Sequence, residues 1–193
     1  YRVVVPQKCG ISSVVSILGY NTSGSLLSKT NTRIQLTKNN QLIHIGSVDE
    51  SKFIIENNVK IDYVFCVVRD PIKRFVSAYK DRVIKKNKDN FGNKNINNLI
   101  TNLPHLISEG TDFGLHCRPQ IEWLGNDPRI YNKIFWTSEI NSEFKPIIET
   151  EINSAIPEVK QNNSSTGTIS LNSDQEKFLS EFYKQDYNFI NQI

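Results

Sequence analysis

The stretch IDYVFCVVRDPIKRFVSAYKDRV, residues 61–83, decides the fold. Its first part, 61–68, is almost entirely apolar, which predicts a strand buried on both faces of a parallel sheet. Asp70 and Pro71 follow and suit the cap and the first turn of a helix. Apolar residues then recur at helical spacing, which predicts a helix that packs one face on the sheet. These residues are Ile72, Phe75, Val76, Tyr79 and Val83.

Outside this stretch, strand-like segments alternate with helix-like ones. Strands are expected at 1–5, 41–46 and 130–137. Helices are expected at 11–19, at 47–58, at 96–109 with an interruption at Pro104, at 142–152, and at 173–190 with a Ser173–Glu176 capping box. Residues 20–40 are polar and predict a long loop, and residues 87–98 are expected to be exposed. The alternation predicts an α/β fold with a parallel sheet, in which ligands bind beyond the carboxyl ends of the strands.

The composition is that of an ordinary soluble globular chain. Of the 193 residues, 38% are hydrophobic and 22% are charged, which suits a single domain. The net charge of +3 is compatible with an anionic ligand and is too small to argue for nucleic acid. No apolar run is long enough to predict a membrane span. The three cysteines and three histidines are scattered without the spacing of metal ligands, so no metal site is expected. Cys66 lies in an apolar run and is expected to be a small buried hydrophobic residue.

The segment PQKCGISSV, residues 6–14, has the features of an anion-binding loop between a strand and a helix. The start of the helix offers free N–H groups, Gly10 allows close backbone approach, and Ser12 and Ser13 add hydroxyl donors. Lys8 adds a positive charge, but it precedes the only glycine of the loop, so this is not a Walker A loop. An ordinary turn with a surface lysine is the alternative.

Arg69 and Ser77 suggest a second anion-binding site. Arg69 follows the buried strand at the ligand edge, and arginine suits two-pronged recognition of phosphate. Ser77 lies eight residues later, about two turns into the helix, where its hydroxyl could meet the same phosphate. In the alternative interpretation, Arg69 pairs with Asp70 or Asp81 and the serine bonds within its own helix.

Taken together, PQKCGISSV and VVRDPIKRFVSAY (67–79) resemble the nucleotide-binding pair of PAPS-dependent sulfotransferases. More narrowly, they resemble the carbohydrate sulfotransferases of the Golgi family 2 type and their bacterial and viral relatives. HCRPQIEWLG (116–125) and KFLSEFYKQDYNFI (177–190) also resemble segments of that family, so the likeness runs nearly end to end. It implies one sulfotransferase domain over 1–193, with a P-loop-like three-layer sandwich in which helices flank a mostly parallel sheet. In the family's first loop lysine directly follows proline, whereas Gln7 intervenes here.

The resemblance also implies a donor site for 3′-phosphoadenosine 5′-phosphosulfate (PAPS), with adenosine 3′,5′-bisphosphate (PAP) as product. The 5′-phosphosulfate would be bound by the first loop, comprising Lys8, Cys9, Gly10, Ile11, Ser12 and Ser13. Arg69 and Ser77 would hold the 3′-phosphate. Ser164, Ser165 and Thr166 occupy the position where relatives close a loop over the nucleotide.

Sulfuryl transfer needs a positive charge at the leaving oxygen and a base for the acceptor hydroxyl. Lys8 is expected to supply the positive charge at the leaving oxygen, and the reaction does not require a metal. His44 is the favoured base because relatives carry a histidine in a strand-end segment before the Arg-Asp-Pro strand. His116 is the rival, and His105 is expected to be structural or exposed. Arg118, Gln120 and the basic stretch 85–94 are candidate contacts for the acceptor.

Two other functions stay open from the sequence: a P-loop kinase-like phosphotransferase, and a non-catalytic module that binds a nucleotide or nucleic acid. The acceptor is expected to be a carbohydrate, with other hydroxyl compounds as alternatives, and no nucleic acid partner is expected. The lack of a disulfide framework favours a bacterial or viral cytoplasm. A Golgi lumen is the alternative if a leader precedes the chain. The sequence gives no signal for oligomeric state.

Overall fold

The computed structural model describes residues 2–4, 9, 13, 14, 17, 34–36, 42–45, 64–87, 89, 91, 95–152, 155, 156 and 167–193. The chain forms two compact units. The sheet unit comprises Tyr1–Val68, Glu122–Gln161 and Ile193, and the helical unit comprises Arg69–Ile121 and Asn162–Gln192. The single domain expected from the sequence stays a prediction.

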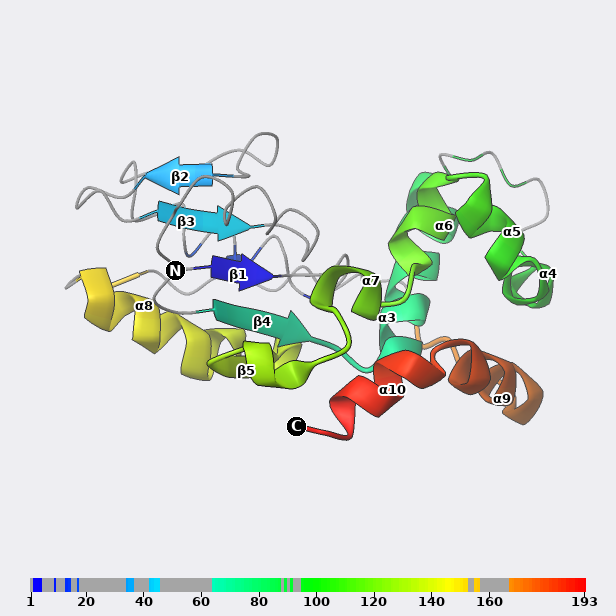
Figure 1. Cartoon of the computed structure of the whole chain (residues 1–193). Helices are drawn as coiled ribbons and strands as arrows, with labels where there is room; N and C mark the ends of the chain where they lie inside the picture. Colours follow the sequence, from blue (N-terminus) through cyan, green and yellow to red (C-terminus); the bar gives the residue numbers. More distant parts are fainter. Residues whose placement is uncertain are drawn as a thin grey trace. The chain divides into compact units, whose positions relative to one another are not determined.

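In the described part of the sheet unit, five strands form one sheet in the order β2-β3-β1-β4-β5 (Figure 1). They are β1 (Arg2–Val4), β2 (Ile34–Leu36), β3 (Leu42–Ile45), β4 (Val64–Val68) and β5 (Lys133–Trp136). β1 pairs in parallel with β3 and with β4, and β4 pairs in parallel with β5. The sheet is therefore mostly parallel, which confirms the predicted fold class.

β2 corrects one prediction. It lies within residues 20–40, which were expected to be a loop, and it pairs antiparallel with β3 at the edge of the sheet. Its three residues are too few to show a periodic pattern, and the surrounding Ser, Thr and Asn residues are typical of loops.

The core of the sheet unit is aromatic where β4 and β5 meet the helix that follows. Phe65 and Phe135 meet edge to face with their ring centroids 5.9 Å apart, and Phe144 lies 5.3 Å from Phe135. A π-helical segment, η4 (Ile140–Phe144), runs into α8 (Lys145–Ile152) and carries Phe144 into this cluster. The short elements α7 (Ile121–Leu124), η2 (Pro128–Ile130) and η3 (Thr137–Glu139) come before η4 in the chain.

A buried strand and two helices were also predicted for this unit. β4 lies between two strands and its last four residues are at most 5% exposed, as expected for a buried strand. Ser13, Val14 and Ile17 are helical and buried, which fits the helix predicted at 11–19. The helix predicted at 47–58 lies outside the described residues.

The helical unit begins with α3 (Pro71–Ala78), which continues as the π-helical segment η1 (Tyr79–Lys86). The Asp70 carboxylate accepts a hydrogen bond from the Lys73 N–H at 2.8 Å, and Pro71 is the first helical residue, so the predicted helix start is confirmed. The segment ends at Asn87, whose φ of 42° is left-handed. The unit also contains α4 (Ile96–Thr101), α5 (Leu103–Ser108), α6 (Asp112–Cys117), α9 (Ser173–Phe182) and α10 (Lys184–Ile190).

Two boundaries in this unit are instructive. α4 ends before Leu103 and Pro104 lies in the first turn of α5, so the predicted interruption is found. The capping box of α9 is formed by Asn172 and Gln175, one residue earlier than the predicted Ser173–Glu176 pair. Both pairs satisfy the capping pattern, so sequence spacing alone could not choose between them.

The buried face of α3 and η1 packs among helices. Phe75 and Val83 are fully buried in a cluster that also takes in buried residues of α4, α5, α6 and α9, and Tyr183 at the end of α9. The buried face is the predicted one, and in this cluster it packs on helices of its own unit, whereas packing of this helix on the sheet stays a prediction. Hydrophobic periodicity identifies which face is buried but not what covers it.

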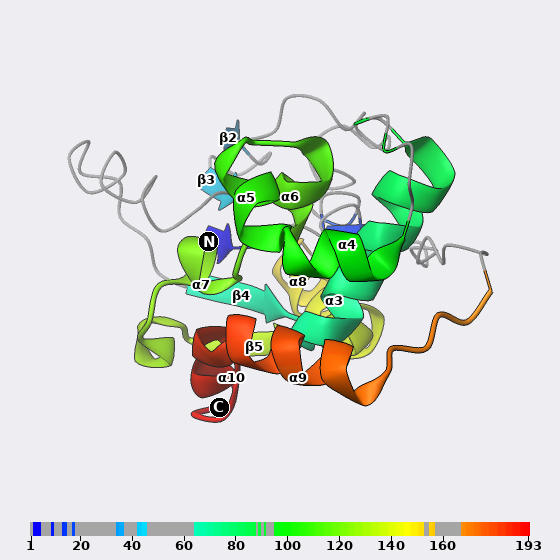
Figure 2. The same cartoon turned by 90° about the vertical axis from the view of Figure 1, so that its right-hand side faces the viewer.

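Gly114 in α6 allows the close approach of α5 (Figure 2). A Cβ at this position would lie 2.8 Å from the Ile107 nitrogen and closer still to the Leu106 carbonyl, which are both backbone atoms. We expect Gly114→Ala to lower the free energy of unfolding by about 1–3 kcal/mol, as overpacking does. Urea unfolding measures this, with Gly167→Ala as the control because a Cβ there meets nothing within 4 Å. Equal effects of the two substitutions would contradict the packing.

Candidate active site

The parallel strands bring their carboxyl ends to one edge of the sheet, where the first predicted loop begins. Of that loop, Cys9 and Ser13 are described, and they are 0% and 6% exposed. The other residues predicted to bind the 5′-phosphosulfate and those of the predicted closing loop lie outside the described residues. They are Lys8, Gly10, Ile11 and Ser12 in the first group and Ser164, Ser165 and Thr166 in the second. His44 is the third residue of β3 and pairs with Arg2 of β1.

Cys9, Cys66 and Cys117 are buried, and none of the three forms a disulfide in the described structure. Cys66 is fully buried in β4, as predicted, and burial raises the pKa of its thiol, with Cys9 adding to the effect. A thiol that stays neutral is a poor nucleophile, so Cys66 belongs to the core of the sheet unit and not to catalysis.

Arg69 lies at the start of the helical unit, where one side chain holds its backbone. The Gln120 amide donates to the Arg69 carbonyl at 2.8 Å and accepts from the Arg69 N–H at 3.0 Å. The Gln120 residue is only 1% exposed. The direction in which the Arg69 side chain leaves the backbone is thus set by a buried amide.

Ser77 lies on the more exposed face of α3. Lys73 and Lys80 are four residues before it and three after it, so they share its face, and all three are partly or fully exposed. An anion at Ser77 would therefore meet lysine ammonium groups as well as a hydroxyl.

Asp70 and Asp81, the alternative partners of Arg69 in the sequence analysis, both make contacts within the helical unit. Asp70 caps α3 and also accepts from the Tyr187 hydroxyl at 3.3 Å. Asp81 pairs with Arg82 and with Lys86, each at 3.2 Å. Burial, helped by the negative charge of Asp70, raises the pKa of Tyr187 to about 12, so this hydroxyl stays a donor at neutral pH.

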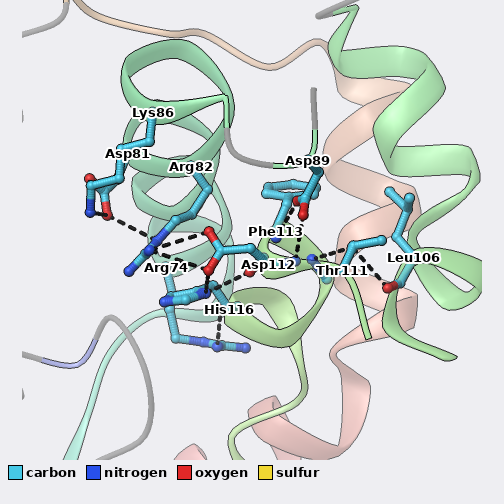
Figure 3. Close-up of polar contacts among 11 residues, drawn as sticks. Arg74, Asp81, Arg82, Lys86, Asp89, Leu106, Thr111, Asp112, Phe113 and His116 are labelled. Atoms are coloured by element: carbon cyan, nitrogen blue, oxygen red, sulfur yellow. Dashed lines mark hydrogen bonds and ion pairs between the residues drawn. The ribbon is translucent and has the colours of Figure 1, made fainter. Parts of the chain in front are cut away.

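His116 lies in the last turn of α6 and is 8% exposed. Its Nδ1 is 2.6 Å from the Asp112 carbonyl, which can only accept, so Nδ1 carries the proton and Nε2 the basic lone pair. The Asp112 carboxylate lies 3.9 Å from the same nitrogen and 3.2 Å from Arg82 (Figure 3). His105 is exposed on α5, as expected.

Asp89 fixes the start of α6 and was missed by the sequence analysis. Its two carboxylate oxygens accept from the N–H groups of Asp112 and Phe113, both at 2.8 Å (Figure 3). Thr111 caps the same helix by accepting from the Gly114 N–H at 3.0 Å. Asp89 lies in a polar stretch that was expected to be exposed, and no local pattern marks a carboxylate that caps a helix 23 residues later.

A buried ion pair is the second feature that the sequence did not reveal. Arg74 and Asp186 have fully buried side chains, 3.9 Å apart. Arg74 also donates to the carbonyls of His116 and Arg118, and its guanidinium lies 5.4 Å from the Tyr183 ring centroid. Burial raises the pKa of Asp186, while hydrogen bonds from the Gln120 and Ile121 N–H groups and the charge of Arg74 oppose that rise.

The helical unit also contains an apolar pocket of about 350 Å³. It is lined by Tyr79, Ile84, Ile96, Gly167, Thr168 and Ile169. Gly167 directly follows the predicted nucleotide-closing residues 164–166, which lie outside the described part of the chain.

Within the described residues, no helix is both long and apolar enough to cross a membrane. Over the same residues, His, Cys, Asp and Glu side chains form no group of three or more suited to a metal ion.

Comparison with known proteins gives a consistent result. A family model described as "Sulfotransferase family" matches residues 3–191. The crystal structure of a sulfotransferase from Alicyclobacillus acidocaldarius is similar at 14% identity, with a TM-score of 0.53 over 99% of this chain and 94% of that one. At this identity the likeness supports the P-loop-like fold alone. No curated protein matches the sequence. Because the family model spans almost every residue, this chain belongs to the sulfotransferase family.

Proposed function

We propose that this chain transfers the sulfuryl group of PAPS to a hydroxyl group of a carbohydrate. The observation that carries the proposal is the segment RDPIKRFVSAY, 69–79. It folds as a capped helix with Arg69 fixed just before it and Ser77 on its lysine-bearing face. Membership of the sulfotransferase family supports the transfer chemistry.

The donor would be held at both of its phosphate ends. Arg69 and Ser77 bind the 3′-phosphate through charge-assisted and hydroxyl hydrogen bonds. Lys8 and the backbone around Gly10 bind the 5′-phosphosulfate, together with the other loop residues named above and the closing residues 164–166. The proposed contacts to the 5′-phosphosulfate are supported by the sequence motif.

The reaction is an in-line displacement at sulfur. The acceptor oxygen forms a new S–O bond while the bond between sulfur and the bridging phosphate oxygen breaks, and PAP leaves with that oxygen. Lys8 neutralises the negative charge that develops on the leaving oxygen. The hydroxyl proton passes to a histidine.

Two histidines are proposed for that base. The resemblance favours His44, and the Nδ1-protonated tautomer supports His116. His44→Gln and His116→Gln separate them, because loss of the general base lowers kcat by about 10²- to 10⁴-fold.

Fewer residues are proposed to contact the acceptor than the donor. Arg118 is partly exposed, and we propose it as an acceptor contact. Gln120 was predicted to bind substrate, but it is buried and its amide serves the Arg69 backbone, so we now propose a positioning role for it. A bacterial or viral cytoplasm stays our proposed location.

The proposal predicts metal-independent sulfuryl transfer. We expect radiolabelled sulfate to pass from PAPS to at least one member of a panel of hydroxylated sugars at the same rate with and without EDTA. Folded Arg69→Ala protein is the negative control. Magnesium-dependent phosphoryl transfer from ATP, with no transfer from PAPS, would contradict the proposal and favour a kinase.

A further inference from the structure

The Arg69 backbone is held from both sides by one buried amide. Gln120 is the donor to its carbonyl and the acceptor from its N–H, so the two bonds fix the peptide groups on either side of the arginine Cα. Such a pair of bonds forms in only one orientation of the backbone. The direction of the Arg69 side chain therefore depends on where Gln120 is held.

Gln120 is held in turn by the C-terminal helix α10. The Asp186 carboxylate accepts from the Gln120 N–H at 2.9 Å and from the Ile121 N–H at 3.1 Å. Asp186 is 1% exposed, so its carboxylate makes these two bonds away from bulk water, where a hydrogen bond is electrostatically stronger.

The residues just before Gln120 are held by the same part of the fold. Arg74 donates to the carbonyls of His116 and Arg118, and Tyr183 donates to the Cys117 carbonyl at 2.7 Å. Three successive carbonyls at the end of α6 are thus paired with buried side chains. The residues whose side chains make these bonds, namely Arg74, Tyr183, Gln120 and Asp186, are all at most 1% exposed.

We infer that Gln120 and Asp186 are positioning residues that aim Arg69 at the 3′-phosphate of the nucleotide, an inference that rests on the proposed function. Asp186 fixes Gln120, Gln120 fixes the Arg69 backbone, and the Arg69 guanidinium selects nucleotides that carry a 3′-phosphate. Loss of Gln120 therefore weakens recognition of the 3′-phosphate more than binding of the rest of the nucleotide.

Calorimetric titration with PAP and with adenosine 5′-monophosphate, which lacks the 3′-phosphate, tests this. We expect Gln120→Ala to bind PAP about tenfold more weakly, as the loss of two backbone hydrogen bonds implies, and to bind the monophosphate within about twofold of wild type. In an Arg69→Ala background the same substitution has no further effect on PAP binding, because Gln120 acts through that side chain.

Gln175→Ala is the matched control. Gln175 is also a buried glutamine of the helical unit, with an amide that binds Asn97 at 2.6 Å and caps α9, but it has no bond to Arg69 in the described structure. Its loss is expected to leave the ratio of PAP to monophosphate affinity unchanged. If Gln120→Ala does not fold, Gln120→Glu replaces it, because an ionised carboxylate still accepts from the Arg69 N–H but cannot donate to the carbonyl.

The outcomes are distinct. If wild type binds PAP and Arg69→Ala weakens it, but the Gln120 variants do not, the positioning role is overturned while the proposed function stands. Equal losses for both nucleotides, or additive losses in the double variant, also overturn it, because they indicate a general structural role. If wild type does not bind PAP, the proposed function fails and the inference fails with it.

Discussion

Arg69→Ala lowers the affinity for PAP by about 10- to 150-fold, because hydrogen bonds to a charged group contribute about 1.5–3 kcal/mol. The substitution removes the guanidinium but leaves the backbone groups that bind Gln120, so the fold of the segment is retained. Ser77→Ala removes a single hydroxyl and costs less, about three- to tenfold. Titration calorimetry in metal-free buffer measures both.

Lys177→Ala is the control for charge alone. Lys177 is an exposed cation on α9 in the same unit, and its loss is expected to change PAP affinity by less than about twofold at physiological salt. If Lys177→Ala and Arg69→Ala weaken binding equally, a diffuse positive field and not a phosphate clamp holds the nucleotide.

Arg74→Ala destabilises the protein by about 3–5 kcal/mol, because it leaves the Asp186 carboxylate buried without its counter-charge. The same substitution strips two carbonyls of their donor, at the end of α6. Urea unfolding followed by circular dichroism measures the loss. Lys184→Ala is the matched control, since its pairing with Glu181 is exposed and contributes at most about 0.5 kcal/mol.

A second comparison separates charge from packing. Arg74→Met combined with Asp186→Asn removes both charges, while the Asn side-chain oxygen remains an acceptor for the Gln120 and Ile121 N–H groups. We expect this pair to be less damaging than Arg74→Ala alone, because no unpaired charge is left buried. A loss below about 1 kcal/mol for Arg74→Ala would show that the pair is hydrated or that its geometry is wrong.

The sequence predicted features that depend on local pattern. Asp70 and Pro71 mark the start of α3 because a capping carboxylate and a first-turn proline act within one turn of chain. The apolar run of β4 predicted an interior strand because burial on both faces excludes polar residues. Arg69 and Ser77 were found because their spacing belongs to a recognisable motif.

Contacts between residues far apart in the chain were not predicted from the sequence, although some of the residues involved stand out in it. Arg74 shares the buried face of α3 with Phe75 and Ala78, and Asp186 lies on the same face of its helix as Phe189. A cation and an anion on two apolar faces need buried partners, which is a reason to pair them. Gln120 gave no such signal. Its side-chain amide binds backbone groups of Arg69, and a contact to backbone groups leaves no pattern in the sequence around Arg69.

The most direct test of the central claim is calorimetric titration of wild-type protein with PAP and with adenosine 5′-monophosphate, in buffer that contains EDTA. We expect micromolar or tighter binding of PAP, with an affinity at least about tenfold higher than for the monophosphate, because we propose that Arg69 and Ser77 bind the 3′-phosphate. Equal affinity for the two nucleotides, or no binding of PAP to well-folded protein, would contradict it.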